Sequence, residues 1–118
     1  MKKTERYAQG DIVLERVEDR RMTGTPMERD PDGAVVLARG EVTGHRHAFY
    51  GGNVVMFRDD ALARDLPAEL YVGHIRVKCD GAELRHEEHD TIALPKGTYR
   101  VRRQREFDAL EAQRVVED

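Results

Sequence analysis

Short apolar stretches rich in Val and Ile alternate with turn residues along almost the whole chain. Segments of this length and spacing are typical of strands in an all-β sandwich or barrel. We therefore expect a mainly antiparallel all-β fold of about seven or eight strands, built as one small sandwich or barrel with at most one or two short helices. The predicted strands are residues 11–17, 34–42, 47–50, 53–57, 70–79, 82–89, 91–94 and 98–107.

A pair of glycines, Gly51 and Gly52, separates two of these predicted strands. Residues that tolerate positive φ are the usual centre of a two-residue β-hairpin turn. This hairpin would pair the strand that holds His45 and His47 with residues 53–57. Because side chains alternate between the two faces of a strand, both histidines are expected on one face, about 7 Å apart along it.

Proline, glycine and aspartate also define the longer connections. Residues 31–33, Pro-Asp-Gly, predict a turn just before a strand, and residues 18–30 are expected to form an irregular loop. Residues 59–70 are the internal helix candidate, with an Asp at the start and Pro67 as an early stop. These connections leave most of the chain to strands.

The stretch 70–79 alternates apolar and polar residues, as expected of a half-buried strand. Its apolar face would carry Tyr71, Ile75, Val77 and Cys79, and its polar face His74, Arg76 and Lys78. We therefore expect His74 at the surface and Cys79 in the interior as a small hydrophobic residue. Cys79 is the only cysteine, so the chain has no internal disulfide.

The composition is typical of a single domain over residues 1–118, with residues 1–9 and 108–118 as its frayed ends. Charged residues make up 36% of the chain and aromatic residues 6%, without Trp, so Val, Ile, Leu and Ala must supply most of the core. The net charge of -3 by itself favours neither a nucleic-acid nor a membrane partner. With no bilayer-spanning apolar run and no signal peptide at the start, we expect a soluble cytoplasmic protein.

Four of the five histidines fall into two short patches. They are His45, His47, His86 and His89. Imidazole binds borderline metals, and a His-x-His pair on a strand directs both rings to one side. We expect the patches to meet around a divalent transition metal such as Zn, Fe, Ni, Mn or Cu, with Glu87 or Glu88 as a further ligand or base. The alternative is that all of these residues are solvated surface side chains.

Two stretches resemble the cupins, a family of β-barrel metal-binding proteins. Residues 39–49, RGEVTGHRHAF, resemble the cupin His-x-His strand, and residues 89–100, HDTIALPKGTYR, resemble a later cupin segment with Pro-x-Gly before a strand. The resemblance implies a jelly-roll or cupin-like barrel with His45 and His47 as metal ligands. The chain departs from that pattern, because no Glu lies in 48–52 and no His follows the Pro-x-Gly. The pattern is also similar to small bacterial proteins of unassigned function.

The strand predicted near the C-terminus is rich in arginine. Its arginines are Arg100, Arg102, Arg103 and Arg105. Arginine presents a planar fork that suits phosphate and carboxylate, so this strand is a candidate contact for an anion, a nucleic acid or a protein partner. The competing interpretation is neutralisation across strands by the acidic residues of 83–90 or 106–118. An interface between copies in a homo-oligomer is a third.

Two hypotheses about function follow. The first is a metal-binding β domain that uses the clustered histidines, with no reaction specified. The second is a non-enzymatic binding or assembly module that uses the basic strand 96–105. A nucleophilic pair of Cys79 and His74 is disfavoured because the two side chains are expected on opposite faces. Whether the protein is an enzyme, and which small molecule or partner it binds, stays open.

Overall fold

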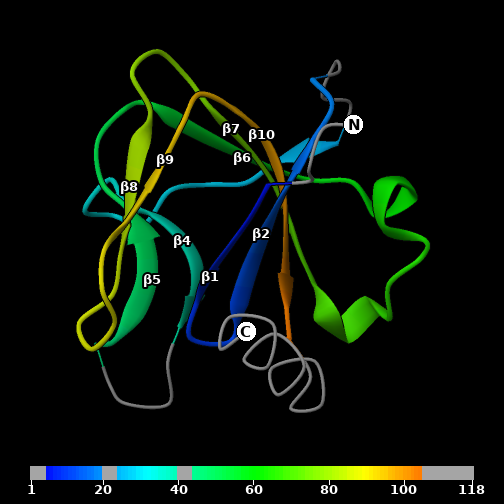
Figure 1. Ribbon diagram of the computed structural model, residues 1–118, viewed down its shortest axis with the longest axis horizontal. Helices are drawn as coiled ribbons and strands as arrows, with labels where there is room; N and C mark the ends of the chain where they lie inside the picture. Colours follow the sequence, from blue (N-terminus) through cyan, green and yellow to red (C-terminus); the bar gives the residue numbers. More distant parts are fainter. Residues whose placement is uncertain (1–4, 20–23, 40–43, 105–118) are drawn as a thin grey trace.

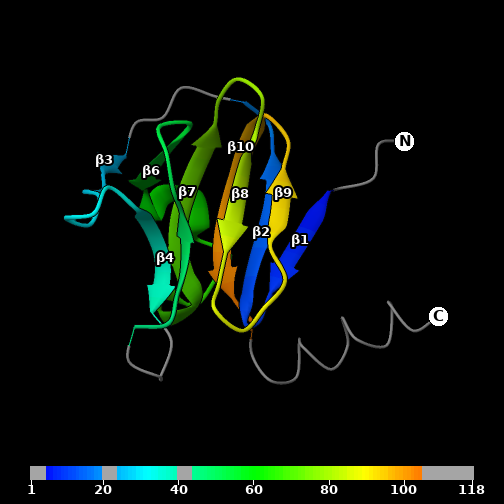
Figure 2. The same ribbon diagram turned by 90° about the vertical axis from the view of Figure 1, so that its left-hand side faces the viewer.

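Two antiparallel sheets packed face to face form the fold (Figure 1 and Figure 2). The computed structural model describes residues 5–19, 24–39 and 44–104. The six-stranded sheet, in the order β1-β2-β10-β7-β6-β3, consists of β1 (Arg6–Gln9), β2 (Ile12–Val17), β3 (Thr25–Pro26), β6 (Val54–Arg58), β7 (Tyr71–Val77) and β10 (Gly97–Arg103). The four-stranded sheet, in the order β4-β5-β8-β9, consists of β4 (Val35–Arg39), β5 (Arg46–Phe49), β8 (Ala82–Arg85) and β9 (Ile92–Leu94). The predicted all-β class is confirmed, as a sandwich rather than a closed barrel.

The chain stays in the six-stranded sheet from β1 to β3 and from then on changes sheet after every two strands. The pairs β1–β2 and β6–β7 belong to the six-stranded sheet, and the pairs β4–β5 and β8–β9 to the four-stranded sheet. In Figure 1 the β1–β2 turn and the β8–β9 loop lie at the lower end of the sandwich, and the crossings from β7 to β8 and from β9 to β10 lie at the upper end. Arg6–Gln9, within the stretch expected to fray, form the edge strand β1 instead.

Apolar side chains from both sheets meet in one core between them. Phe49, Leu84 and Leu94 of the four-stranded sheet are at most 1% exposed, as are Ile12 and Ile75 of the six-stranded sheet. The remaining buried members of this cluster are Leu14, Val35, Leu37, Ala38, Val54, Met56, Val77, Tyr99 and Val101. Aliphatic residues therefore supply most of the core, as the composition predicts.

The predicted hairpin around Gly51 and Gly52 is wrong. Strand β5 pairs with β4 and β8, and β6 pairs with β7 and β3, so residues 51–53 carry the chain from one sheet to the other. Gly51 does adopt a positive φ of 98°, as a tight bend requires. Local composition identified the bend correctly. The pairing of the strands depends instead on the core, because the apolar faces of β5 and β6 cover it from opposite sheets.

Two other predicted connections form largely as expected. The Gly33 N–H donates to the Asp30 carbonyl at 2.8 Å, which closes the turn before β4. Residues 59–70 contain two short 3-10 helices, η1 (Asp60–Ala63) and η2 (Ala68–Leu70), rather than one helix. The described residues contain no helix of the length and hydropathy that crossing a membrane requires. The cytoplasmic location stays a prediction.

The expectations for His74 and Cys79 are both wrong. His74 is only 3% exposed, although it lies in the regular part of the pairing with β10, opposite Arg100. Its Nδ1 lies 2.7 Å from the Tyr71 hydroxyl, which also accepts the Asp59 N–H at 3.1 Å. Cys79 is exposed because β7 ends at Val77, and it lies in the next turn with a φ of 54°. Packing around His74 and the end of the strand before Cys79 thus override what a regular alternation predicts.

Candidate metal centre

The two histidine patches meet at one end of the sandwich. His86 is central, since its ring centroid lies 4.4 Å from that of His47, 4.6 Å from that of His89 and 5.8 Å from that of His45. The centroids of His47 and His89 are 5.9 Å apart. Because β5 and β8 are antiparallel neighbours with Ala48 opposite Arg85, the next step of this register brings positions 47 and 86 together. Strand pairing thus explains the cluster.

The tightest group of potential ligands combines both patches. His45, His86 and Glu87 each offer a ligand atom, and these three atoms lie within 4.8 Å of one another. Ligands of one tetrahedral zinc ion, with bonds of about 2.0 Å, would lie about 3.3 Å apart. The group therefore needs a modest contraction to hold an ion. Glu87 is one of the two acidic residues predicted as a ligand or base.

His47 occupies the most protected position of the cluster. It lies within β5, is 4% exposed, and its Nδ1 is 2.8 Å from Gln9 Oε1. Its Nε2 lies 3.8 Å from Asp11 Oδ1. Burial, followed by the nearby charge of His86, lowers the pKa of His47 to about 4. The ring is therefore neutral at pH 7, which is the form that binds metals.

The β8–β9 loop holds His86 and its neighbours by different contacts. The backbone N–H of Glu88 donates to His86 Nδ1 at 3.0 Å. Glu87 Oε1 accepts the backbone N–H of Arg46 at 2.9 Å, and this hydrogen bond is the main reason why the pKa of Glu87 is lowered. The Glu88 carboxylate is more remote, 3.6 Å from His45 Nδ1, and its side chain is 63% exposed. Glu87 is therefore the better placed of the two acids.

The β1–β2 turn contributes residues that the sequence did not reveal. Gln9 and Asp11 contact His47, and the backbone of Gly10 lies so close to the cluster that a Cβ there would be 2.8 Å from His89 Nε2. Gly10 also has a positive φ of 58°. From the sequence we expect Gln9 in a frayed end and Asp11 at the start of a strand, and only the packing of the two sheets brings these residues and Gly10 to the histidines.

The arginines of β10 are engaged in ion pairs within the molecule. Arg100 and Arg102 both contact the Glu15 carboxylate at 3.1 Å, and Arg100 also contacts Asp65 at 2.7 Å. Arg103 contacts Asp11 at 2.9 Å. Neutralisation across strands is thus observed, although through other acids than the predicted segment 83–90. Arg105 and residues 106–118 lie outside the described residues, and contact with a nucleic acid or protein partner stays a prediction.

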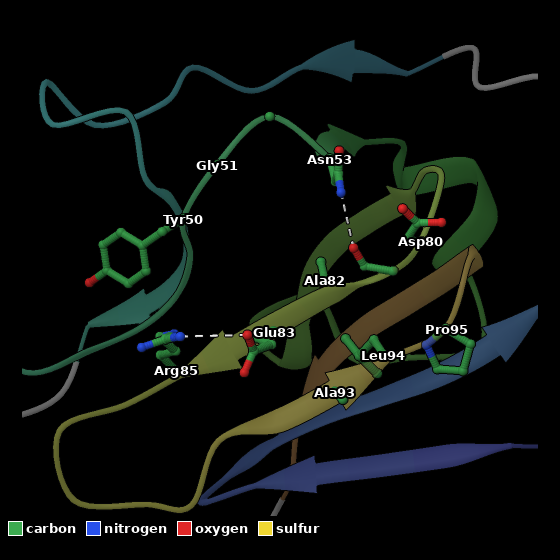
Figure 3. Close-up of a pocket in the computed structure, with 12 residues that line it drawn as sticks. Tyr50, Gly51, Asn53, Asp80, Ala82, Glu83, Arg85, Ala93, Leu94 and Pro95 are labelled. Atoms are coloured by element: carbon green, nitrogen blue, oxygen red, sulfur yellow. Dashed lines mark hydrogen bonds and ion pairs between the residues drawn. The ribbon is translucent and has the colours of Figure 1, made fainter.

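A separate hollow of about 890 Å³ lies away from the histidines, where the chain crosses between the sheets (Figure 3). It is lined by residues near the ends of β5, β7 and β9 and by part of β8, including Tyr50, Asp80 and Pro95. Glu83 and Arg85 pair across its lining at 3.5 Å, and Asn53 Nδ2 donates to the Gly81 carbonyl at 3.2 Å. None of its lining residues is a histidine.

One protein-family model matches residues 8–104. The chain belongs to this family, the domain of unknown function DUF8820. The match covers both sheets except the first two residues of β1, and it includes all four clustered histidines, so the candidate site lies within the DUF8820 domain. Neither the curated proteins nor the solved structures contain a significant match to the chain. The resemblance to cupins receives no support from these comparisons.

Proposed function

We propose that this DUF8820 domain binds a divalent transition metal at the end of the sandwich where β5 meets the β8–β9 loop. The observation that carries the proposal is the cluster of rings around His86. The ring centroids of His45, His47 and His89 all lie within 6 Å of the His86 centroid. His45, His86 and Glu87 form the primary ligand group, because their ligand atoms are the closest together. His47 is the fourth ligand, and His89 supports the site.

The electrostatics of the cluster favour this function. Protonated imidazoles in such close contact would repel one another, and the charge of His86 is one of the causes that lower the pKa of His47. Each neutral imidazole has one ring nitrogen with a lone pair, and a metal ion can bind several such nitrogens at once. His47, whose pKa is lowered to about 4, is neutral at pH 7 and so is ready to bind an ion.

The chemistry of the ligands restricts the choice of metal. The group offers imidazole nitrogens and a carboxylate oxygen, a combination that suits Zn, Fe, Ni, Mn or Cu. Cys79 lies in the turn between β7 and β8, at the upper end of the sandwich in Figure 1, so no thiolate joins the group. The site is therefore better suited to borderline ions than to the soft Cu(I).

The test is a titration of chelator-treated protein with Co²⁺, followed by the visible absorption of the bound ion, with Zn²⁺ as competitor. We expect about one ion per chain, and at least about tenfold weaker binding for His86→Asn and Glu87→Gln. The matched control is Glu83→Gln, an acid on β8 whose side chain is 58% exposed and whose ion pair is with Arg85. Circular dichroism verifies that each variant is folded.

Two results would contradict the proposal. One is wild-type protein that produces no change in Co²⁺ absorption. The other is equal affinity in the wild type and in His86→Asn, since an ion bound elsewhere would not depend on the central imidazole.

A further inference from the structure

The side chain of Gln9 joins the two sheets at the histidine cluster. Gln9 ends β1 in the six-stranded sheet, is 3% exposed, and reaches across to the four-stranded sheet. Its Nε2 donates to the Leu84 carbonyl of β8 and to the Asp90 carbonyl of the β8–β9 loop, both at 2.9 Å. Its Oε1 lies 2.8 Å from His47 Nδ1. All three contacts are thus made by one buried amide.

These contacts fix the orientation of the amide. A backbone carbonyl can only accept a hydrogen bond, so the group that faces the Leu84 and Asp90 carbonyls must be the NH₂ of Gln9. Its two hydrogens are then both used. The group that faces His47 is the amide oxygen, which can only accept, so His47 Nδ1 must carry a proton and donate it.

A neutral imidazole carries one proton, and in His47 this proton is on Nδ1. We infer that Gln9 is a positioning residue that fixes the tautomer of His47 and leaves Nε2 as its lone-pair atom. The tautomer follows from the hydrogen bonds alone. Its use in binding an ion rests on the proposed function. Hydrogen-bond partners of this kind orient metal-binding histidines and raise their basicity.

The neighbouring ring provides an internal contrast. His86 Nδ1 accepts the backbone N–H of Glu88, so the proton of a neutral His86 is on Nε2. Two imidazoles whose centroids are 4.4 Å apart therefore hold opposite tautomers. The contrast also shows why an amide suits position 9, because a carboxylate there could not donate to the Leu84 and Asp90 carbonyls.

The test is the ¹⁵N chemical shifts of the histidine side chains in metal-free protein at neutral pH. We expect a protonated Nδ1 and an unprotonated Nε2 for His47, and the reverse for His86 in the same spectrum. In Gln9→Met, which keeps the bulk of the side chain but removes the amide, the Nδ1–H form of His47 should no longer dominate. A wild-type His47 with its proton on Nε2 would overturn the inference, even if Gln9→Met fails to fold.

A second measurement separates this inference from the proposed function. Cd²⁺ enriched in ¹¹³Cd is added to the wild type, and scalar couplings from the ion to the His47 ring protons identify the bound nitrogen. Coupling through Nε2, with about 10–100-fold weaker Cd²⁺ binding in Gln9→Met, supports both the role of Gln9 and the proposed metal function. Coupling through Nδ1 would overturn the inference alone. No Cd²⁺ binding, with the predicted tautomer present, would refute the proposed metal function and leave the role of Gln9 intact.

Discussion

The two halves of the histidine cluster are prepared differently for a ligand. His47 lies within a strand, is 4% exposed, and is held by the Gln9 amide so that Nε2 keeps its lone pair. His86 follows the end of β8, and the lone pair of its Nδ1 is already used by the Glu88 N–H. In the strand half, His47 Nε2 therefore has a lone pair available before any ion binds. In the loop half, the hydrogen bond to His86 Nδ1 must change before that nitrogen could bind an ion.

The strand half of the cluster is held more rigidly than the loop half. A strand in the middle of a sheet is fixed by neighbours on both sides, as β5 is by β4 and β8. Residues 86–91 connect β8 to β9 and are fixed mainly by individual contacts such as those of Gln9 and Arg46. In the proposed metal site, the loop would close the ligand group around the ion while the strand stays fixed.

The largest expected effect is on stability, when His47 and His86 are each replaced by alanine. His47→Ala should lower the free energy of unfolding by about 2–4 kcal/mol, because it opens a cavity and leaves Gln9 Oε1 buried without a donor. His86→Ala, at a loop position, should cost less than about 1 kcal/mol. Urea unfolding of metal-free protein measures both. Equal losses would show that the two halves are equally built into the fold.

The second prediction concerns pH. The pKa of His47 is about 4 in the folded chain and close to 6.5 in the unfolded chain, so between these values the unfolded chain binds more protons. The contribution of neutral His47 to the free energy of unfolding is therefore complete above about pH 6.5 and is lost as the pH falls toward 4. We expect the wild type to lose on the order of 2 kcal/mol more than His47→Gln over this window. Parallel pH profiles from urea unfolding would contradict the burial argument.

The third prediction uses two glycines with similar backbone and different surroundings. Gly10 and Gly33 have φ of 58° and 88°, but an added Cβ would meet His89 Nε2 at 2.8 Å in the first case and no atom within 4 Å in the second. Both alanine variants should lose about 1 kcal/mol from backbone strain. Only Gly10→Ala should also displace the His89 ring and weaken Zn²⁺ binding, as seen by NMR and titration. If Gly10→Ala displaced the His47 ring and left the His89 ring in place, the strand would not be the more rigid half of the cluster.

Much of the fold was predictable because it depends on short-range patterns. Alternating apolar stretches and turn residues gave the class, and the Pro-Asp-Gly turn formed where expected. Strand partners did not follow in the same way, since Gly51 and Gly52 bend the chain equally well inside a hairpin or between two sheets. His74 is buried and lies against the Tyr71 hydroxyl, a packing that the apolar–polar alternation along one strand does not encode.

The candidate site was predictable in its histidines and not in its supporting residues. His45, His47, His86 and His89 stand out because four of the five histidines fall into two short patches and imidazole is chemically distinctive. Gln9, Gly10 and Asp11, which contact the histidines, carry no distinctive pattern in the sequence. Their role depends on the distance between two sheets, a long-range property. The same limit applies to Glu15, which lies far in sequence from the arginines that it neutralises.

The smallest expected effect distinguishes the two acidic residues of the loop. Glu88 has a side chain 63% exposed and contacts His45 only at 3.6 Å, so Glu88→Gln should change stability by less than about 0.5 kcal/mol and Zn²⁺ affinity by less than about twofold. Glu87→Gln should weaken Zn²⁺ binding at least about tenfold, because Glu87 belongs to the tight ligand group. Isothermal titration of both variants measures the difference. A larger loss in Glu88→Gln would mean that the loop rearranges on binding so that its two acids exchange places, and the adaptable half would then be more mobile than its contacts in the metal-free chain imply.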